Sequence, residues 1–277
     1  MSDTTARPTP YGARGADSTG GAGSTGSTAL GLDSISKSFG GLHVLSSVTF
    51  DVPEATVFGI AGPNGAGKTT LLNLLTGFGT FSGGRMTIHG QDATGKDARA
   101  ISALGVARTF QNIRLFRGLT VREQVEAGTY RHRKASLLSS LAVSPTDRRD
   151  RQETRAAAEE VLEFVGLADQ ADRLAETMSY GDQRRIEIAR ALATRPTLLM
   201  LDEPTAGMND ADWLPIAELL DRLRSDGMTV VVVEHNMRLL ERSCDRVAVI
   251  AAGEVIAEDE PYTCLRRPEV RRAYFGK

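Results

Sequence analysis

A glycine-rich segment at residues 62–69 contains the residue types and spacing that most clearly predict chemistry. Its sequence, GPNGAGKT, fits the pattern G-x-x-x-x-G-K-[ST]. An apolar run at residues 56–61 precedes it and predicts a buried strand, and residues 68–76 predict a helix. Glycines let the backbone curl until several N–H groups point inward, and the positive end of the following helix adds to them. The segment is therefore predicted to bind phosphate, with a chance glycine-rich turn as the alternative.

Two side chains at the end of this segment suggest a nucleoside triphosphate with a divalent cation. Lys68 brings a mobile positive charge to the β- and γ-phosphates, and the Thr69 hydroxyl can coordinate Mg²⁺.

A second apolar run, at residues 198–201, ends in two acids. Asp202 is placed where a carboxylate can hold the metal through water, and Glu203 can polarise an attacking water as a general base. Two acids after a hydrophobic run can also be a solvated strand end, but the phosphate loop favours the functional interpretation.

The elements around these residues alternate between strands and helices. The pattern predicts strands at residues 44–52, 56–61, 85–89, 198–201, 229–233 and 247–250, and helices at residues 68–76, 154–165, 183–193 and 213–224. This alternation indicates an α/β core with a mostly parallel sheet. Residues 121–178 show no strand-like run and predict a helical insertion. Within it, the basic run at residues 131–134 is interpreted as a solvated face, with contact to anionic lipid headgroups as the alternative.

Composition limits the classes of function. The chain has 277 residues and a net charge of −2, with 5% aromatic residues, which argues against a nucleic-acid partner. No apolar run approaches the roughly 20 residues that span a bilayer. Residues 1–29 are rich in Gly, Ser and Thr, lack a secretory h-region and predict a disordered tail before one domain at residues 30–277. The two cysteines have no metal-ligand spacing and indicate a reducing compartment.

The motifs together resemble the ATP-binding subunits of ABC transporters, and the resemblance covers about residues 30–277. It is carried, in the family's order, by the phosphate loop at 62–69, a glutamine loop RTFQ at 108–111, a signature MSYGD at 178–182, the acidic strand at 198–203, a D-loop AGMN at 206–209 and a switch histidine in VEH at 233–235. It implies a P-loop NTPase core with a mostly parallel sheet, an antiparallel β subdomain and a helical subdomain at about residues 112–182.

The resemblance also implies roles for individual residues. Phe39 matches the aromatic residue that stacks on adenine, with a core or strand-end residue as the alternative. Gln111 would bind Mg²⁺ and the attacking water, together with Thr69 and Asp202 as metal-binding residues. His235 would contact the γ-phosphate and orient Glu203. The implied nucleotide-binding residues are Phe39, Gly62, Pro63, Asn64, Gly65, Ala66, Gly67, Lys68, Thr69, Thr70, Ser179 and Gly181.

The signature implies that two ATP-binding subunits act together. Ser179, Gly181 and the N-terminus of a helix from about Gln183 would form an anion site facing the γ-phosphate held by the other subunit. Read from the residues alone, Ser179 is a helix cap and Gly181 a tight turn. The implied cofactors are ATP and Mg²⁺. The implied partners are transmembrane permeases, a second ATP-binding subunit and, indirectly, an extracytoplasmic solute-binding protein, with the chain at the cytoplasmic face of the plasma membrane.

Departures from the usual motifs narrow the resemblance. Tyr180 and Asp182 replace the usual Gly and Gln of the signature, and Asn209 replaces the usual Asp of the D-loop. These departures, with SYGDQRRIEIARAL at 179–192 and PEVRRAYFG at 268–276, resemble importers of branched-chain amino acids. Importers of urea or short-chain amides share the features. A soluble non-transport ABC ATPase and a small-molecule kinase are further alternatives.

Overall fold

The computed structural model describes residues 27–129, 145–209 and 212–276. The first strand, β1 (Thr28–Phe39), begins inside the tail that we expected at residues 1–29. Ala29 is fully buried, so the domain begins at least two residues before the expected boundary. The rest of that tail and the basic run at 131–134 lie outside the described residues.

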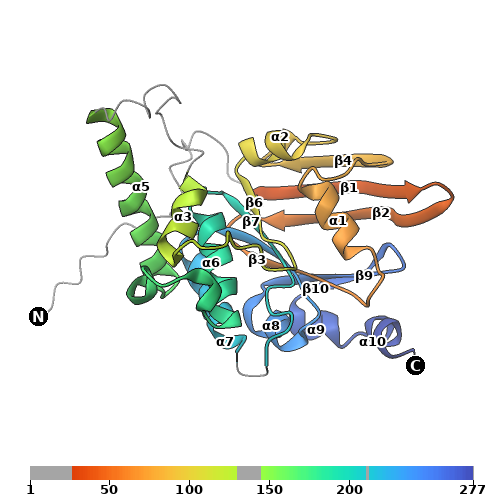
Figure 1. Cartoon of the computed structure of the whole chain (residues 1–277). Coiled ribbons are helices and arrows are strands. Elements are labelled where there is room, and N and C mark those ends of the chain that lie inside the picture. Colours follow the sequence, from red (N-terminus) through yellow and green to blue (C-terminus); the bar gives the residue numbers. More distant parts are fainter. Residues whose placement is uncertain (1–26, 130–144, 210–211, 277) are drawn as a thin grey trace, which may run out of the picture.

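The central sheet has six strands in the order β10-β9-β3-β8-β7-β6 (Figure 1). Its strands are β3 (Val57–Ala61), β6 (Val106–Arg108), β7 (Leu198–Asp202), β8 (Thr229–Val233), β9 (Arg246–Ala251) and β10 (Glu254–Asp259). All pairings are parallel except that between β9 and β10. Every residue of β3, β7 and β8 is buried, as expected for parallel strands covered on both faces. The prediction of a mostly parallel sheet is confirmed.

A second sheet is antiparallel, with the order β2-β1-β4-β5. It contains β1, β2 (Leu42–Pro53), β4 (Gly83–Ile88) and β5 (Gln91–Asp92). Phe50 of β2 stacks on Phe58 of β3 with ring centroids 5.2 Å apart, which joins the two sheets. This sheet is the antiparallel subdomain that the resemblance implied.

The helices cover the sheet and form the insertion (Figure 1). They are α1 (Lys68–Leu75), α2 (Ala98–Ala103), α3 (Val121–Thr129), α5 (Pro145–Phe164), α6 (Tyr180–Leu192), α7 (Leu214–Ser225), α8 (Met237–Ser243), α9 (Pro261–Leu265) and α10 (Pro268–Phe275), with short 3₁₀ turns at Ala168–Gln170 and Ala175–Thr177. The insertion and the antiparallel sheet lie at opposite ends of the view. Among the described residues, we find no helix with the length and apolar character needed to cross a bilayer.

Alternate residues of the central strands face two separate hydrophobic cores. Ile60 and Met200 belong to the core shared with α1 and the antiparallel sheet. Ala61 and Leu201 belong to the core on the other face, which includes residues of α5, α6, α7 and α8. The central sheet is therefore held rigidly between two layers, and its strand ends provide a fixed frame for the loops that follow them.

Two helices begin earlier than predicted, and one of them, α5, begins at Pro145 instead of residue 154. We expected α6 to begin near Gln183, but it begins at Tyr180 because the Ser179 side chain caps it, with Oγ accepting from the Asp182 N–H at 3.2 Å. Gly181 therefore lies in the first turn of a helix, not in a tight turn.

Candidate functional site

The sequence motifs converge at one edge of the central sheet. Strands β3, β8, β7 and β6 are adjacent and parallel, so their carboxyl ends meet at the same edge. The phosphate loop follows β3, the acids end β7, His235 follows β8 and the glutamine loop follows β6. Ligands of open α/β sheets bind at this edge.

The phosphate loop is shaped by glycines that other residues could not replace. Gly62 has φ of 153°, and a Cβ there would lie 2.1 Å from the Ile250 carbonyl oxygen. Gly67, the N-cap residue of α1, has φ of 102°, and a Cβ there would lie 2.7 Å from Leu45. The backbone therefore adopts a curl that side chains would block.

Lys68 lies inside this curl. Its Nζ donates hydrogen bonds to the carbonyls of Gly62 at 2.7 Å and Pro63 at 3.0 Å, and the residue is 6% exposed. Burial lowers the pKa of Lys68, while the nearby carboxylates of Glu203, Glu234 and Asp202 favour its charged form. The Thr69 side chain is exposed and can reach a ligand.

The acids at the end of β7 have different environments. Asp202 is 2% exposed and forms an ion pair with Arg108, whose guanidinium lies 2.7 Å from Asp202 Oδ2. Glu203 is half-buried and has φ of 46°, an unusual left-handed conformation for a residue with a side chain. Its N–H donates to the Val233 carbonyl of β8 at 2.9 Å, which fixes the turn. Such local strain is typical of functional sites.

Gln111 and His235 both approach the Glu203 carboxylate. Gln111 Nε2 donates a hydrogen bond of 2.8 Å to Glu203 Oε2, and His235 Nδ1 lies 3.8 Å from the same oxygen. The His235 side chain is 53% exposed, so it can contact a ligand outside the sheet. Two side chains, from the ends of β6 and β8, thus approach one carboxylate at the end of β7 that could orient water.

Glu234 is a supporting residue that the sequence analysis did not assign. It is fully buried, and its Oε2 accepts from the N–H groups of His235 at 2.8 Å and Asn236 at 3.0 Å. Its Oε1 accepts from both the N–H and the hydroxyl of Thr205. Glu234 therefore joins two loops through its carboxylate: the loop that carries His235 and the loop that follows Glu203. No motif separates such a glutamate from an ordinary strand-end acid.

Arg184 is the second residue that sequence reasoning missed. This α6 side chain is fully buried and donates to the carbonyls of Phe110 at 2.7 Å and Gln111 at 2.6 Å. It also pairs with Glu187 at 2.7 Å, and burial raises the pKa of Glu187. The helix that begins with the signature is therefore bonded directly to the glutamine loop.

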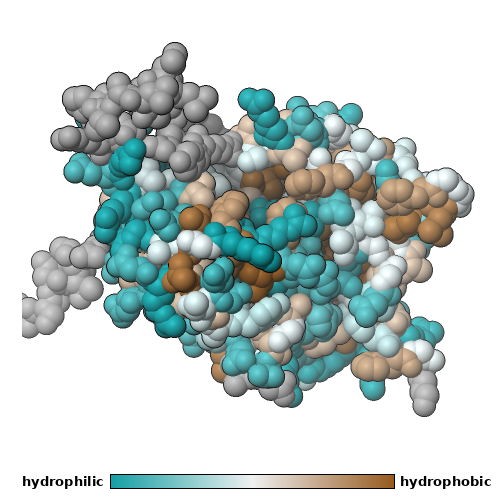
Figure 2. Space-filling view, in the orientation of Figure 1, coloured by the Kyte–Doolittle hydropathy of each residue, from teal (hydrophilic) through white to brown (hydrophobic). Residues whose placement is uncertain are grey.

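The structure does not bring the signature or Phe39 into this cluster. Helices α6 and α1 stand apart in Figure 1, and no hydrogen bond among the described residues joins Ser179 or Gly181 to the phosphate loop. Phe39 ends β1 and is 56% exposed, with Lys37 Nζ 4.7 Å from its ring centroid. Figure 2 shows the tip of the β1–β2 hairpin as a hydrophobic surface. The core alternative for Phe39 was wrong.

The signature and the D-loop lie against each other within the chain. A Cβ on Gly207 would lie 3.5 Å from the Tyr180 hydroxyl. Asp182 pairs with Arg185 of the same helix, and Asn209 Nδ2 donates to Asp212 at 3.3 Å. The three residues that depart from the usual motifs, Tyr180, Asp182 and Asn209, therefore each lie against another residue of this chain.

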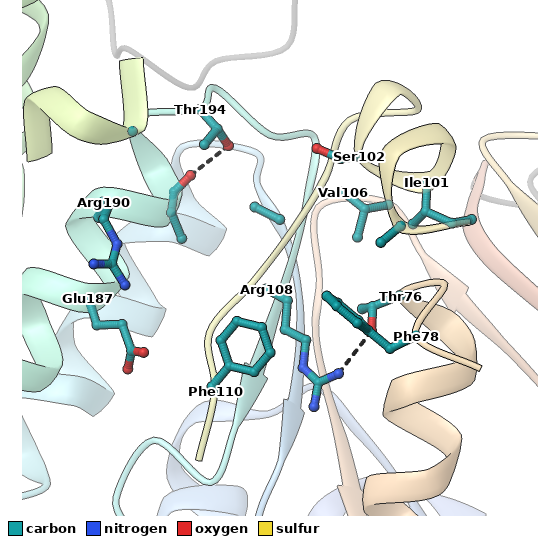
Figure 3. A pocket seen from close by; sticks show the side chains of 14 residues that line it. Thr76, Phe78, Ile101, Ser102, Val106, Arg108, Phe110, Glu187, Arg190 and Thr194 are labelled. Atoms are coloured by element: carbon teal, nitrogen blue, oxygen red, sulfur yellow. Dashed lines mark hydrogen bonds between the residues drawn. The ribbon is translucent and has the colours of Figure 1, made fainter. Parts of the chain in front are cut away.

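A pocket of about 310 Å³ lies beside β6, between the α1–α2 region on one side and helices α3 and α6 on the other (Figure 3). Its walls combine apolar side chains, among them Phe78, Phe110 and Ile101, with the charged groups of Arg108 and Glu187. Glu187 Oε1 is buried and has no hydrogen-bond partner among the described residues. The pocket therefore offers a mainly apolar surface close to the glutamine loop.

The fold and site define an ATP-binding cassette. A family model described as ABC transporter matches residues 45–206, and the chain belongs to this family as an ATP-hydrolysing subunit. It is 40% identical over 249 residues, 90% of this chain and 98% of the relative, to the high-affinity branched-chain amino acid transport ATP-binding protein BraF of Pseudomonas aeruginosa.

Solved structures agree with this assignment. An ATP-binding cassette of an ABC transporter in its ADP conformation is 31% identical, with a TM-score of 0.79 over 90% of this chain and 99% of that chain. A cassette described as dimeric, in a post-hydrolysis state bound to ADP and Pi, is 27% identical, with a TM-score of 0.70 over 84% of this chain and 98% of that chain.

Proposed function

We propose that the edge cluster hydrolyses ATP with Glu203 as general base. The phosphate loop holds the phosphates, and Lys68 leaves its carbonyl partners to contact the β- and γ-phosphates. Gln111 and His235 hold Glu203 and the attacking water in place. The supporting observation is the convergence of both side chains on Glu203 Oε2, at 2.8 and 3.8 Å.

The oxygen donors at this edge fit Mg²⁺. Thr69 offers an exposed hydroxyl, Asp202 a carboxylate and Gln111 an amide oxygen, which are hard ligands suited to this ion. No cluster of three or more His, Cys, Asp or Glu that could hold a metal occurs in the described part of the chain, so the phosphates of ATP would complete the site. Bound Mg²⁺ would neutralise charge on the β- and γ-phosphates.

A single chain holds only half of each ATP site in this proposal. Ser179 and Gly181 lie at the N-terminus of α6, away from the phosphate loop of their own chain. A helix N-terminus favours an anion, so the signature would face the γ-phosphate on a second subunit. Phe39, exposed on the β1–β2 hairpin, would stack on adenine. Closure on ATP and opening after hydrolysis would supply the motion for transport.

The solute that we propose is a branched-chain amino acid, imported across the plasma membrane. The support is the 40% identity to a branched-chain amino acid transport subunit over nearly the whole of both chains. Transmembrane permeases would bind this chain at the cytoplasmic face of the membrane, and a solute-binding protein would act on the far side.

The pocket beside the glutamine loop is the proposed permease contact. A short helix with apolar side chains would fit the apolar walls of this pocket. Because Arg184 bonds both α6 and the glutamine loop, an occupant would contact the segment that carries Gln111. Ala191→Trp would fill the pocket, and we expect it to retain ATP binding while losing co-purification with membrane subunits.

Turnover of the Glu203→Gln variant tests the catalytic proposal. We expect it to bind Mg²⁺ and ATP normally but to lose about 10²- to 10⁴-fold in kcat, the range for a general base. Normal turnover would remove Glu203 from that role. Uptake of labelled leucine into cells whose own cassette subunit has been deleted tests the solute, with labelled urea as the competing substrate.

A further inference from the structure

Arg108 connects the phosphate-binding side of the molecule to the acidic strand end. It is the last residue of β6, and its guanidinium donates from Nη2 to Asp202 Oδ2 at 2.7 Å. The Arg108 side chain is 7% exposed and that of Asp202 is 3% exposed. The ion pair is therefore shielded from water, so its geometry is held more strongly than that of a surface pair.

Two further hydrogen bonds fix the guanidinium at its other end. Nη1 donates to Asn73 Oδ1 at 2.7 Å and to the Thr76 hydroxyl at 2.9 Å. Both acceptors lie at the end of α1, the helix that begins with Lys68. One side chain thus joins β6, the phosphate-loop helix and the end of β7.

Aromatic rings hold the same guanidinium from the pocket side. The Phe110 ring centroid lies 5.0 Å from Arg108 Cζ and that of Phe78 lies 5.9 Å away, with the two rings edge to face. Figure 3 shows Arg108 passing between these rings, with its hydrogen bond to Thr76. Phe78 is 59% exposed and lines the pocket.

This arrangement restrains the Asp202 carboxylate. With Oδ2 held by Arg108, the carboxylate cannot rotate without breaking a buried ion pair, and the Asp202 N–H, which donates to the Thr109 hydroxyl at 3.4 Å, holds the backbone beneath it. Its other oxygen is left in one orientation for the metal and its water. Outer-shell partners of this kind orient metal-binding carboxylates and contribute to metal affinity.

We propose that Arg108 is a positioning residue that holds Asp202 for Mg²⁺, and that its ring contacts make metal binding sensitive to changes in the pocket. The inference rests on the proposed role of Asp202 in holding the metal. A change at Phe78 alters the pocket contact of Arg108 without altering any contact of Asp202. Among the described residues, no hydrogen bond, ion pair or ring contact joins Phe78 to Asp202.

Mn²⁺ binding, followed by electron paramagnetic resonance on the full chain with the non-hydrolysable analogue AMP-PNP, tests this proposal. Arg108→Met should weaken Mn²⁺ binding about 10-fold, the lower end for loss of an outer-shell partner. AMP-PNP binding in EDTA should change less than about twofold. Arg108→Lys keeps the positive charge but loses the planar guanidinium with its several donors, and should restore part of the Mn²⁺ affinity. Phe78→Leu should weaken Mn²⁺ binding about two- to fivefold, the worth of an exposed cation–π contact.

Two further variants make the outcomes distinct. Arg114→Met removes the other guanidinium over Phe110, 4.4 Å from its centroid, and should leave Mn²⁺ binding unchanged. In an Asp202→Asn background, Arg108→Met should add no further loss of Mn²⁺ binding.

If Asp202→Asn alone leaves Mn²⁺ binding intact, the metal role of Asp202 is wrong, and this inference with it. If Asp202→Asn weakens binding but Arg108→Met does not, or if Arg108→Met weakens AMP-PNP equally in EDTA, only the positioning role is overturned. Unchanged Mn²⁺ binding in Phe78→Leu would overturn the link to the pocket.

Discussion

Gln111 and Glu203 are joined by a hydrogen bond of 2.8 Å between Nε2 and Oε2, which connects the loop after β6 to the end of β7. The glutamine loop also begins the connection to the helical insertion and is bonded to α6 through Arg184. The carboxylate proposed as the base is therefore linked, through one amide, to the part of the molecule where a permease would bind. Movement of that loop would change the position of Glu203.

Gln111→Ala should lower turnover without weakening nucleotide binding. Loss of the amide removes the partner that orients Glu203, and misplacement of a catalytic group by about 1 Å can cost about 100-fold. We expect kcat to fall by about 10- to 100-fold, with ATP affinity in EDTA unchanged, when hydrolysis and equilibrium binding are measured side by side. A wild-type kcat in this variant would show that the hydrogen bond has no part in turnover.

Gly62→Ala should prevent the phosphate loop from closing. The new Cβ would lie 2.1 Å from the Ile250 carbonyl oxygen, so β3 or β9 must shift. We expect the free energy of unfolding to fall by at least about 1–3 kcal/mol, the cost of such backbone strain, with ATP binding lost. Gly65→Ala is the matched control, since Gly65 also has positive φ but no atom within 4 Å of the added Cβ. Equal losses in urea denaturation of the two variants would contradict the role of the clash.

Arg184→Met should destabilise the joint between α6 and the glutamine loop. The variant removes donors to two carbonyls and leaves Glu187 buried without its cation. Breaking a buried pair in this way costs about 3–5 kcal/mol, whereas replacing both partners is far less costly. Denaturant unfolding should therefore show partial recovery in Arg184→Met/Glu187→Leu. No recovery would mean that the carbonyl contacts, not the ion pair, dominate.

Both cysteines should be unreactive in the folded chain. Burial raises the pKa of the Cys264 thiol to about 11 and that of Cys244 further. The reactive thiolate is therefore scarce at pH 8, and labelling by a disulfide reagent should be slow until the chain unfolds. The folded state keeps protons that the unfolded thiols release above about pH 8.5, so these groups lose their stabilising effect as the pH rises from there. Rapid native labelling of either thiol would contradict the burial.

The sequence predicted the parts of the site that depend on local patterns. Residues 62–67 form the loop between β3 and α1, Lys68 and Thr69 begin α1, and Asp202 ends β7, as expected, because buried parallel strands and a glycine-rich turn have strong local signals. The structure then shows that these segments meet at one edge, because the strands that carry them are adjacent and parallel. What each side chain would do with its ligand stays a proposal.

The remaining features depend on contacts between distant segments. Arg108 and Asp202 are 94 positions apart, and Arg184 reaches carbonyls more than 70 positions away, so no spacing rule could pair them. Strand β1 was missed because its register shifts interrupt the alternation of buried and exposed residues. The late start expected for α6 was instead a local error, since Ser179, which the residues alone indicated as a helix cap, caps the helix at its start at Tyr180.

The oligomeric state of Glu203→Gln with ATP and Mg²⁺ tests the central claim, that each ATP is held between two chains. Sedimentation should show a stable dimer with ATP and monomers without it, since the γ-phosphate joins the phosphate loop of one chain to the signature of the other. Adding Ser179→Arg should abolish the ATP-dependent dimer while each chain still binds ATP. A chain that stays monomeric with ATP, or a dimer that survives Ser179→Arg unchanged, would contradict the account.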